Sequence, residues 1–171
     1  MGKFLPFAGL LVVALALVGT AAAGKVGLAK TWVYDPGNLG TASATWTKDG
    51  LSLQKDAPLT ANLAAGVEFK GLEGQMLTKL SFDVKGYCGA GAPRFNVSTD
   101  AGTSFFGCTY GTHTPLADGW ERVVFSGGAP GTVGAFAQVL EGVDVVMDES
   151  GRTLLRNITV NGVAVDKFPH S

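Results

Sequence analysis

Histidine, serine and cysteine side chains can act as bases or nucleophiles in hydrolysis, so their pattern is the first test for an enzyme. The chain contains two histidines, His113 and His170, and neither a G-x-S-x-G nor an H-E-x-x-H motif. His113 lies in the stretch 111–115, which has the composition of a loop, and His170 is the penultimate residue. The sequence therefore predicts no enzyme and no cofactor, and a small secreted hydrolase remains the catalytic alternative.

Three acidic residues in the last third of the chain could act as an acid–base pair or hold calcium. Asp144, Asp148 and Glu149 are close together in the sequence. Carboxylate oxygens are the ligands that calcium prefers, and two carboxylates can share acid and base roles. The run 148–151 has the composition of a turn, however. We expect a solvated turn there, with calcium binding by Asp144 and Asp148 as the alternative.

Two cysteines, Cys88 and Cys108, are the only ones in the chain. In an exported protein such a pair usually forms one disulfide, and without a nearby pair of histidines they are too few ligands for structural zinc. They flank the expected strand Arg94–Ser98. If the three neighbouring strands form a meander, residues two strands apart are ~10 Å apart, too far for a disulfide. We expect Cys88 to leave the sheet, helped by Gly86 and Gly89.

Two alternating strands offer the best candidate binding surface. In Leu80–Lys85 and Arg94–Ser98, apolar and polar residues alternate, so one face of each should line the core. The opposite faces carry polar side chains and an aromatic ring: Asp83, Lys85, Tyr87, Arg94 and Asn96. A ring that stacks on a sugar, beside groups that bind its hydroxyls, would recognise a saccharide. The alternative is a solvated sheet face on which these charges balance one another.

Other polar and aromatic residues have simpler interpretations. Trp32, Trp46 and Trp120 are expected to be anchors of the core or of sheet edges rather than ligand platforms. Asn96 and Asn157 each begin an N-glycosylation sequon, but both lie inside expected strands, where a glycan is unusual. Whether either asparagine carries a glycan is left open.

The elements that must position these residues are short strands joined by tight turns. Glycine is frequent, at 25 residues, and only 16% of the chain is charged. Alternating runs bounded by Gly, Pro and Asp-Gly or Asn-Gly turns predict an all-β, antiparallel two-layer β-sandwich with about nine strands. A helix over 135–141 is the one expected exception, with a strand as its alternative. The expected core includes Leu80, Phe82, Val84, Phe95 and Val97.

The first 23 residues have the pattern of a secretory signal peptide. Lys3 precedes the apolar run Phe4–Val18, and Thr20–Ala23 supplies small residues at the cleavage site. The run is shorter than the ~20 residues that span a bilayer. We therefore expect cleavage between Ala23 and Gly24, and a single domain over 24–171. The protein should be secreted or extracellular, with the periplasm or cell surface as alternatives, and without a membrane span after cleavage.

The charge balance argues against nucleic acid as a partner. The chain has 13 Lys and Arg against 14 Asp and Glu, and the basic residues are scattered. Nucleic acids and anionic membranes select for clustered basic residues. The remaining partner classes are a saccharide and another protein.

Three segments between residues 77 and 160 resemble the galactose-binding-like jelly roll, the fold of many carbohydrate-binding modules and of laminin IV-type modules. They are 77–84 (LTKLSFDV), 136–146 (FAQVLEGVDVV) and 154–160 (LLRNITV). Arg156 stands where these modules usually have an aspartate that often holds structure or calcium, which weakens any inherited metal site. The resemblance implies a jelly-roll sandwich and concerns fold more than function, because this fold carries many roles.

Two functions from different classes follow. The first is a secreted, non-catalytic binding domain whose ligand is a carbohydrate. The second is an extracellular structural or adhesive protein that acts through protein contacts.

Overall fold

Short alternating segments form strands throughout the computed structural model, which describes residues 28–127 and 136–165. The predicted signal peptide, 1–23, lies outside these residues. Within them the structure has twelve strands and two short 3-10 helices, η1 (Cys108–Tyr110) and η2 (Ala117–Gly119). The strands are β1 Leu28–Tyr34, β2 Ala42–Thr47, β3 Gly50–Lys55, β4 Ala64–Lys70, β5 Lys79–Gly86, β6 Arg94–Thr99, β7 Gly102–Gly107, β8 Thr112–Pro115, β9 Glu121–Ser126, β10 Leu140–Met147, β11 Gly151–Val160 and β12 Val163–Ala164.

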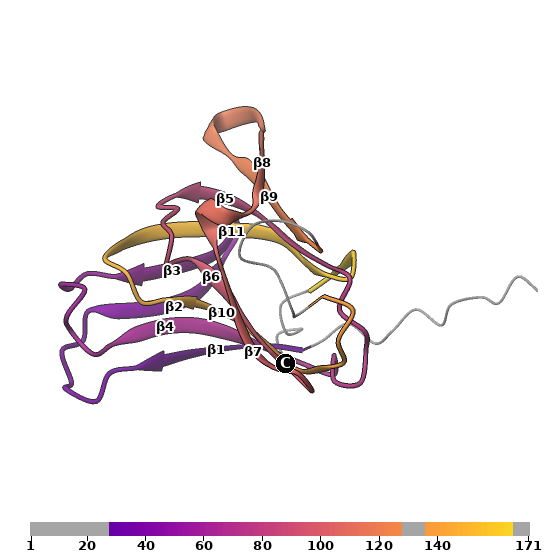
Figure 1. Cartoon of the computed structure of the whole chain (residues 1–171). Helices are drawn as coiled ribbons and strands as arrows, with labels where there is room; N and C mark the ends of the chain where they lie inside the picture. The colour runs from indigo at the N-terminus through magenta and orange to yellow at the C-terminus, as the bar shows by residue number, and fades with distance from the viewer. Residues whose placement is uncertain (1–27, 128–135, 166–171) are drawn as a thin grey trace, which may run out of the picture.

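The strands form two antiparallel sheets that pack face to face (Figure 1). The five-stranded sheet has the order β1-β4-β10-β6-β7, and the seven-stranded sheet has the order β2-β3-β11-β5-β9-β8, with β12 beside β11. The β8–β9 hairpin projects from the edge of the sandwich (Figure 1). The predicted antiparallel sandwich is confirmed. Among the described residues, no helix is long and apolar enough to cross a membrane.

The core lies between the two sheets and contains the side chains that alternation assigned to it. Leu80, Phe82, Val84, Phe95 and Val97 are all buried, as predicted. The rings of Phe82 and Phe95, which come from opposite sheets, stack with centroids 5.3 Å apart. Aromatic pairs of this geometry add to the free energy gained from burial alone. The inward faces of the strands therefore hold the layers together and leave the outward faces to water.

Two strands and one turn differ from the sequence-based expectation. The prediction of about nine strands missed β2 and β8, since β2 is rich in Ala, Ser and Thr and β8 has only four residues. The prediction of a helix over 135–141 is wrong for residues 136–141, the part of this segment that the structure describes. Phe136–Gln138 form a turn in which Ala137 has φ 65°, Val139 makes an isolated bridge to Met76, and Leu140 begins β10. The apolar residues whose spacing suggested a helix instead belong to the connection between the two sheets.

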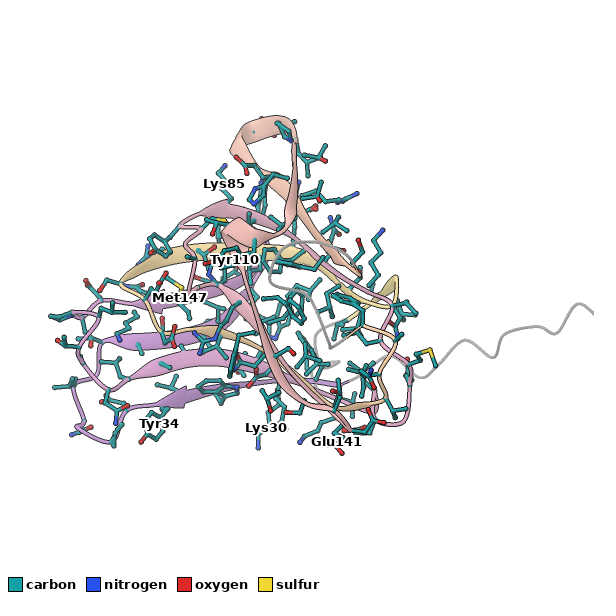
Figure 2. All side chains as sticks on the ribbon, in the orientation of Figure 1. Lys30, Tyr34, Lys85, Tyr110, Glu141 and Met147 are labelled. Atoms are coloured by element: carbon teal, nitrogen blue, oxygen red, sulfur yellow. A yellow bond between two sulfur atoms is a disulfide. The ribbon has the colours of Figure 1, made fainter. Side chains whose placement is uncertain are left out.

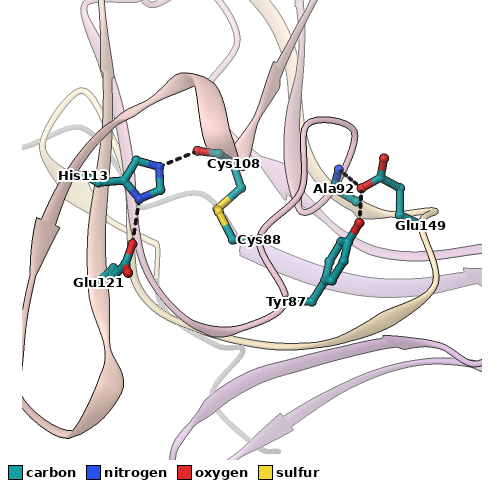
Figure 3. The surroundings of a disulfide bond; sticks show 7 residues. All are labelled: Tyr87, Cys88, Ala92, Cys108, His113, Glu121 and Glu149. Atoms are coloured by element: carbon teal, nitrogen blue, oxygen red, sulfur yellow. Dashed lines mark hydrogen bonds and ion pairs between the residues drawn. A yellow bond between two sulfur atoms is a disulfide. The ribbon is translucent and has the colours of Figure 1, made fainter.

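The disulfide between Cys88 and Cys108 is present, with Cα atoms 5.3 Å apart (Figure 3). The meander assumed for it is wrong, because β5 belongs to the seven-stranded sheet and β6 and β7 to the five-stranded sheet. The bridge therefore joins the segment after β5 to the start of η1 after β7. It is a covalent tie between the two layers at one end of the sandwich.

Candidate functional site

The five predicted site residues do not share a face. Asp83, Lys85 and Tyr87 belong to β5 or follow it, whereas Arg94 and Asn96 belong to β6 in the other sheet. The chain crosses the sandwich between these two strands. Because both strands turn their apolar side chains toward the core, their polar side chains point away from each other. The prediction of one continuous polar face is therefore wrong, and two separate surfaces must be considered.

Asp83 is a buried structural carboxylate, with 1% of its surface exposed. Arg122 on β9 donates from Nε and Nη2 to its two oxygens at 2.7 and 3.2 Å, and Asn157 Nδ2 donates to Oδ2 at 2.7 Å. Burial alone would raise the pKa of Asp83. These hydrogen bonds and the charges of Arg122 and Arg156 outweigh it and hold the pKa below its ordinary value. Its oxygens are thus committed to the protein.

Tyr87 is also engaged by the protein, although it is partly exposed. Its hydroxyl donates to Glu149 Oε2 at 2.8 Å, and the same oxygen accepts from the backbone amide of Ala92 (Figure 3). The other oxygen of Glu149 accepts from the backbone amide of Gly91. The hydrogen bond to Glu149, with burial and the negative charge of Glu149, raises the pKa of Tyr87. Glu149 therefore fastens the β10–β11 turn to the crossing between the sheets.

Arg94 is the centre of a hydrogen-bonded cluster on the outer face of the five-stranded sheet. Its Nη1 lies 2.6 Å from Asp148 Oδ1 and 2.8 Å from the carbonyl oxygen of Gly91, and its Nε donates to Asn96 Oδ1 at 2.7 Å. Asp148 is thus an ion-pair partner, and the turn that holds it is fixed further by Lys55, whose Nζ donates to the Asp148 carbonyl at 2.8 Å. Arg94 and Asn96 are the two predicted site residues that the structure brings together.

Two rows of directly opposed residues run across this outer face from β1 to β7. Neighbours in a row are side by side on the surface. The first row is Trp32, Gly66, Val146, Arg94 and Gly107. The second row is Lys30, Glu68, Asp144, Asn96 and Phe105. We call the surface formed by Trp32, Glu68, Asp144, Arg94, Asn96 and Phe105 the five-stranded face. Figure 2 shows Lys30 on this side of the molecule and Lys85 on the other.

Trp32 lies over Gly66 on the five-stranded face. A Cβ at Gly66 would lie 2.5 Å from Trp32 Cζ2, so only glycine lets the indole pack this closely against the backbone of β4. The tryptophan is half-buried, and part of its ring stays open to solvent. At the opposite edge, Phe105 is 59% exposed and has the Arg94 guanidinium 5.6 Å from its ring centroid. Two aromatic rings therefore bracket the polar part of this face.

Asp144 lies at the middle of the five-stranded face, and one of its oxygens is free. Its Oδ1 is buried and has no hydrogen-bond partner in the described structure. Burial raises its pKa to about 6, against the lowering influence of Arg94 and Asn96. A hollow of about 170 Å³ lies beside it, lined by Glu68, Asn96, Ser98, Gly142, Val143 and Asp144. Asp144 thus lines an open depression, while its unpaired oxygen is buried beneath the surface.

The calcium candidate Asp148 and the candidate base His113 are both engaged by other groups of the protein. Of the two calcium candidates, Asp148 is paired with Arg94, and no group of three or more His, Cys, Asp or Glu among the described residues could hold a metal ion. His113, the candidate base, has Nδ1 2.7 Å from Glu121 Oε2 and Nε2 3.0 Å from the Cys108 carbonyl oxygen (Figure 3). Both ring nitrogens of His113 are thus engaged within the protein.

A second concave surface lies on the seven-stranded sheet, beside a bulge in β11 between Arg156 and Thr159. We call it the groove. Its volume is about 630 Å³, and its lining includes Trp46, Lys85, Asp118, Trp120, Arg156 and Asn157. The sequence singled out Lys85 alone of these as a binding residue. Trp120 was expected only as a possible neighbour of that site, and the remaining residues were not predicted, because the bulge and two loops, far apart in the chain, bring them together.

Comparisons with known proteins concern the fold. No protein-family model matches the chain, and no curated protein is similar to it in sequence. Among solved structures, a family 11 carbohydrate-binding module of a cellulosomal cellulase from Clostridium thermocellum has 13% identity and a TM-score of 0.45 over 88% of this chain and 94% of that one. A family 29 carbohydrate-binding module has 10% identity and a TM-score of 0.45 over 76% and 73%.

A further family 11 module from Clostridium thermocellum was solved in complex with a β-1,3-1,4-mixed-linked tetrasaccharide. It has 15% identity and a TM-score of 0.43 over 81% of this chain and 86% of that one. The weak likeness to carbohydrate-binding modules noted in the sequence is thus also found among solved structures. The functional argument depends on the two surfaces described above.

Proposed function

We propose that this chain is an exported, non-catalytic saccharide-binding domain and that its site is the five-stranded face. One observation carries the proposal: the partly open indole of Trp32 over Gly66 lies one row from Glu68, Asp144 and Asn96. A sugar ring has apolar C–H faces and a rim of hydroxyls. An exposed ring next to carboxylate and amide groups matches both parts of such a ligand.

The polar groups on this face differ in how they could contribute. Asp144 Oδ1 has no hydrogen-bond partner among the described residues, but it is buried, so it can accept from a ligand hydroxyl only after the carboxylate turns toward the hollow. Arg94 and Asn96 are already held by hydrogen bonds to each other and to Asp148. Side chains held in place before binding lose less conformational entropy when the ligand arrives. The site therefore combines a free acceptor with rigid neighbours.

The shape of the face favours an extended ligand. Trp32 and Phe105 lie on the two edge strands, four interstrand spacings apart, which is ~19 Å at ~4.8 Å per spacing. Beside Asp144 and Asn96, one row further from Trp32, Gly142 leaves open space where a side chain would otherwise stand. A saccharide chain lying across the strands could contact both rings and the carboxylates between them. Arg94 and Asn96 keep their predicted role in this proposal, whereas Asp83 does not.

The test is titration of the mature protein, residues 24–171, with soluble neutral glucans, xylans, mannans and galactans. Trp32→Ala should weaken binding of the preferred polysaccharide about fivefold or more, because aromatic stacking contributes roughly 1 kcal/mol. Tyr110→Ala is the matched control, since Tyr110 is an exposed aromatic outside the five-stranded face. Isothermal titration calorimetry measures both affinities, and circular dichroism checks that each variant is folded.

Either of two results would remove the proposal. If no polysaccharide binds the wild-type protein, the structural or adhesive function becomes the better account. If folded Trp32→Ala binds as tightly as the wild type, the five-stranded face is not the site. Asp144→Asn gives a second, independent measurement on the same face, because it keeps the size of the side chain while replacing an anionic acceptor oxygen by an amide donor, and it should also weaken binding.

A further inference from the structure

We propose that the groove on the seven-stranded sheet is a second ligand site and that it takes the carboxylate of a uronate-containing saccharide. The groove and the five-stranded face lie on opposite sheets, and they share no residue. The inference therefore does not depend on the neutral-saccharide site proposed above.

Arg156 is held in place but makes no hydrogen bond in the described structure. Its guanidinium carbon lies 4.0 Å from the centroid of the Trp120 ring, and its Nε forms an ion pair with Asp83 Oδ2 at 3.6 Å, which is too long for a hydrogen bond. Arg122 and Asn157 already occupy the Asp83 oxygens. The Arg156 side chain is 42% exposed. Its planar donors are therefore oriented by Trp120 and remain available to a ligand.

Lys85 supplies a second available cation. It follows Asp83 by two residues along β5, and the register places Lys85 opposite Leu154 and Asp83 opposite Arg156. Lys85 and Arg156 are thus diagonal neighbours on the same face, and both line the groove. The Lys85 amine makes no ion pair or hydrogen bond among the described residues. Two cations with unused donors at diagonal positions are suited to a carboxylate.

The acidic residues near the groove do not cancel this charge. Lys48 and Asp49 form an ion pair with each other at the rim. The negative charge of Asp83 is balanced by Arg122, which donates two hydrogen bonds to its carboxylate. Asp118 is the remaining acidic residue that lines the groove, against both Lys85 and Arg156. The groove therefore keeps a net positive charge, which favours an anionic ligand.

The rest of the lining favours a sugar ring as the carrier of that carboxylate. Trp46, Leu154, Ile158 and Val165 add apolar surface to the groove, and Asn157 adds an amide. At about 630 Å³ the groove falls within the usual range of small-ligand sites, ~300–1,000 Å³. A ring with apolar faces, hydroxyls and one carboxylate, as in a uronic acid, contacts every kind of surface present there.

The experiment compares two oligosaccharides that differ in the charge of the carboxylate, with only a methyl group added to the neutral one. The mature protein is titrated by calorimetry with oligogalacturonate and with its methyl ester, in which the carboxylate is neutral. We expect oligogalacturonate to bind and its ester to bind at least about tenfold more weakly, as the loss of charge-assisted hydrogen bonds implies. Lys85→Gln and Arg156→Gln should each weaken oligogalacturonate binding by a similar factor. Lys85→Gln is the safer variant, because Lys85 has no partner whose loss could affect folding.

Trp32→Ala separates this proposal from the previous one, because it should leave oligogalacturonate binding unchanged. The proposal is overturned if oligogalacturonate does not bind, if the ester binds equally well, or if both charge variants bind like the wild type. Aspartate- and glutamate-rich peptides are titrated in parallel. Should they bind as tightly, with the same sensitivity to Lys85→Gln, the groove is a site for acidic peptides and the saccharide assignment is wrong.

Discussion

Asp83 and Asp144 are both carboxylates on strands in the middle of a sheet, yet the two faces that carry them treat them in opposite ways. Asp83, on the seven-stranded sheet, accepts three hydrogen bonds from Arg122 and Asn157, and its pKa is lowered. Asp144, on the five-stranded sheet, has one oxygen without a partner, and its pKa is raised to about 6. Burial acts on both groups. The difference lies in whether the neighbouring cations reach the carboxylate.

This difference separates a structural carboxylate from an available one. The oxygens of Asp83 already accept hydrogen bonds from Arg122 and Asn157, and Arg156 forms an ion pair with them, so the role of Asp83 is structural. The groups on that face that remain available to a ligand are cationic. On the five-stranded face, Arg94 is directed to Asp148 instead, and the available group is Asp144. The two faces thus differ in the sign of the charge that they offer to a ligand. A polar sheet face is therefore assigned a role from its unused donors and acceptors, rather than from its composition.

The largest expected effect on stability comes from the tie between the two layers. Replacing Cys88 and Cys108 together by alanine should lower the free energy of unfolding by about 3 kcal/mol, because the bridge closes a loop with a sequence separation of 20. Denaturant unfolding followed by circular dichroism measures the loss. Reductant should destabilise the wild type by a similar amount and leave the double variant unchanged. An unchanged wild type under reducing conditions would show that the bridge does not stabilise the sandwich.

A smaller effect should follow from breaking the network around Asp83. Arg122→Ala should cost about 2–3 kcal/mol at pH 7, near the low end for a buried charge that loses a partner, because Arg156 and Asn157 stay beside it. Since the pKa of Asp83 is lowered by folding, this contribution is present above pH 3.8 and is lost as the pH falls through the lowered value. Arg152→Ala is the control, because among the described residues the Arg152 guanidinium hydrogen-bonds only to the neutral Gln54. Equal losses for both variants would contradict the prediction.

Asp144→Asn should increase the free energy of unfolding, and its effect should be the smallest of the three. Folding raises the pKa of Asp144 from 3.8 to about 6, so the ionised group reduces stability increasingly as the pH rises between these values. The variant should therefore be more stable than the wild type by about 1–2 kcal/mol at pH 7, less than the full shift implies, because Asp144 is partly exposed. Near pH 3 the two should be equal. Unfolding curves at both pH values measure this, and a variant that is less stable at pH 7 would show that the carboxylate is satisfied.

The sequence by itself determined the local structure and the division between core and surface. Side chains in a strand alternate between its two faces, so the apolar members of Leu80–Val84 and Arg94–Val97 had to face the core whichever sheet each strand joined. The two cysteines and their pairing were likewise predictable from composition and spacing. These features depend on residues that are neighbours in the chain and on the solvent preference of single side chains, and both can be taken directly from the sequence.

Only the tertiary structure decided which polar residues meet. The sequence placed Asp83 and Arg94 on one surface, because consecutive strands often pair, but β5 pairs with β11 and β6 pairs with β10. Paired residues are 67 to 80 positions apart in the chain for β5 and β11 and 41 to 52 for β6 and β10, and the selection of these partners depends on hydrogen bonds and core packing between distant segments. Trp32 over Gly66, Arg156 over Trp120 and the free oxygen of Asp144 all result from that selection, since each depends on a neighbour supplied by another strand.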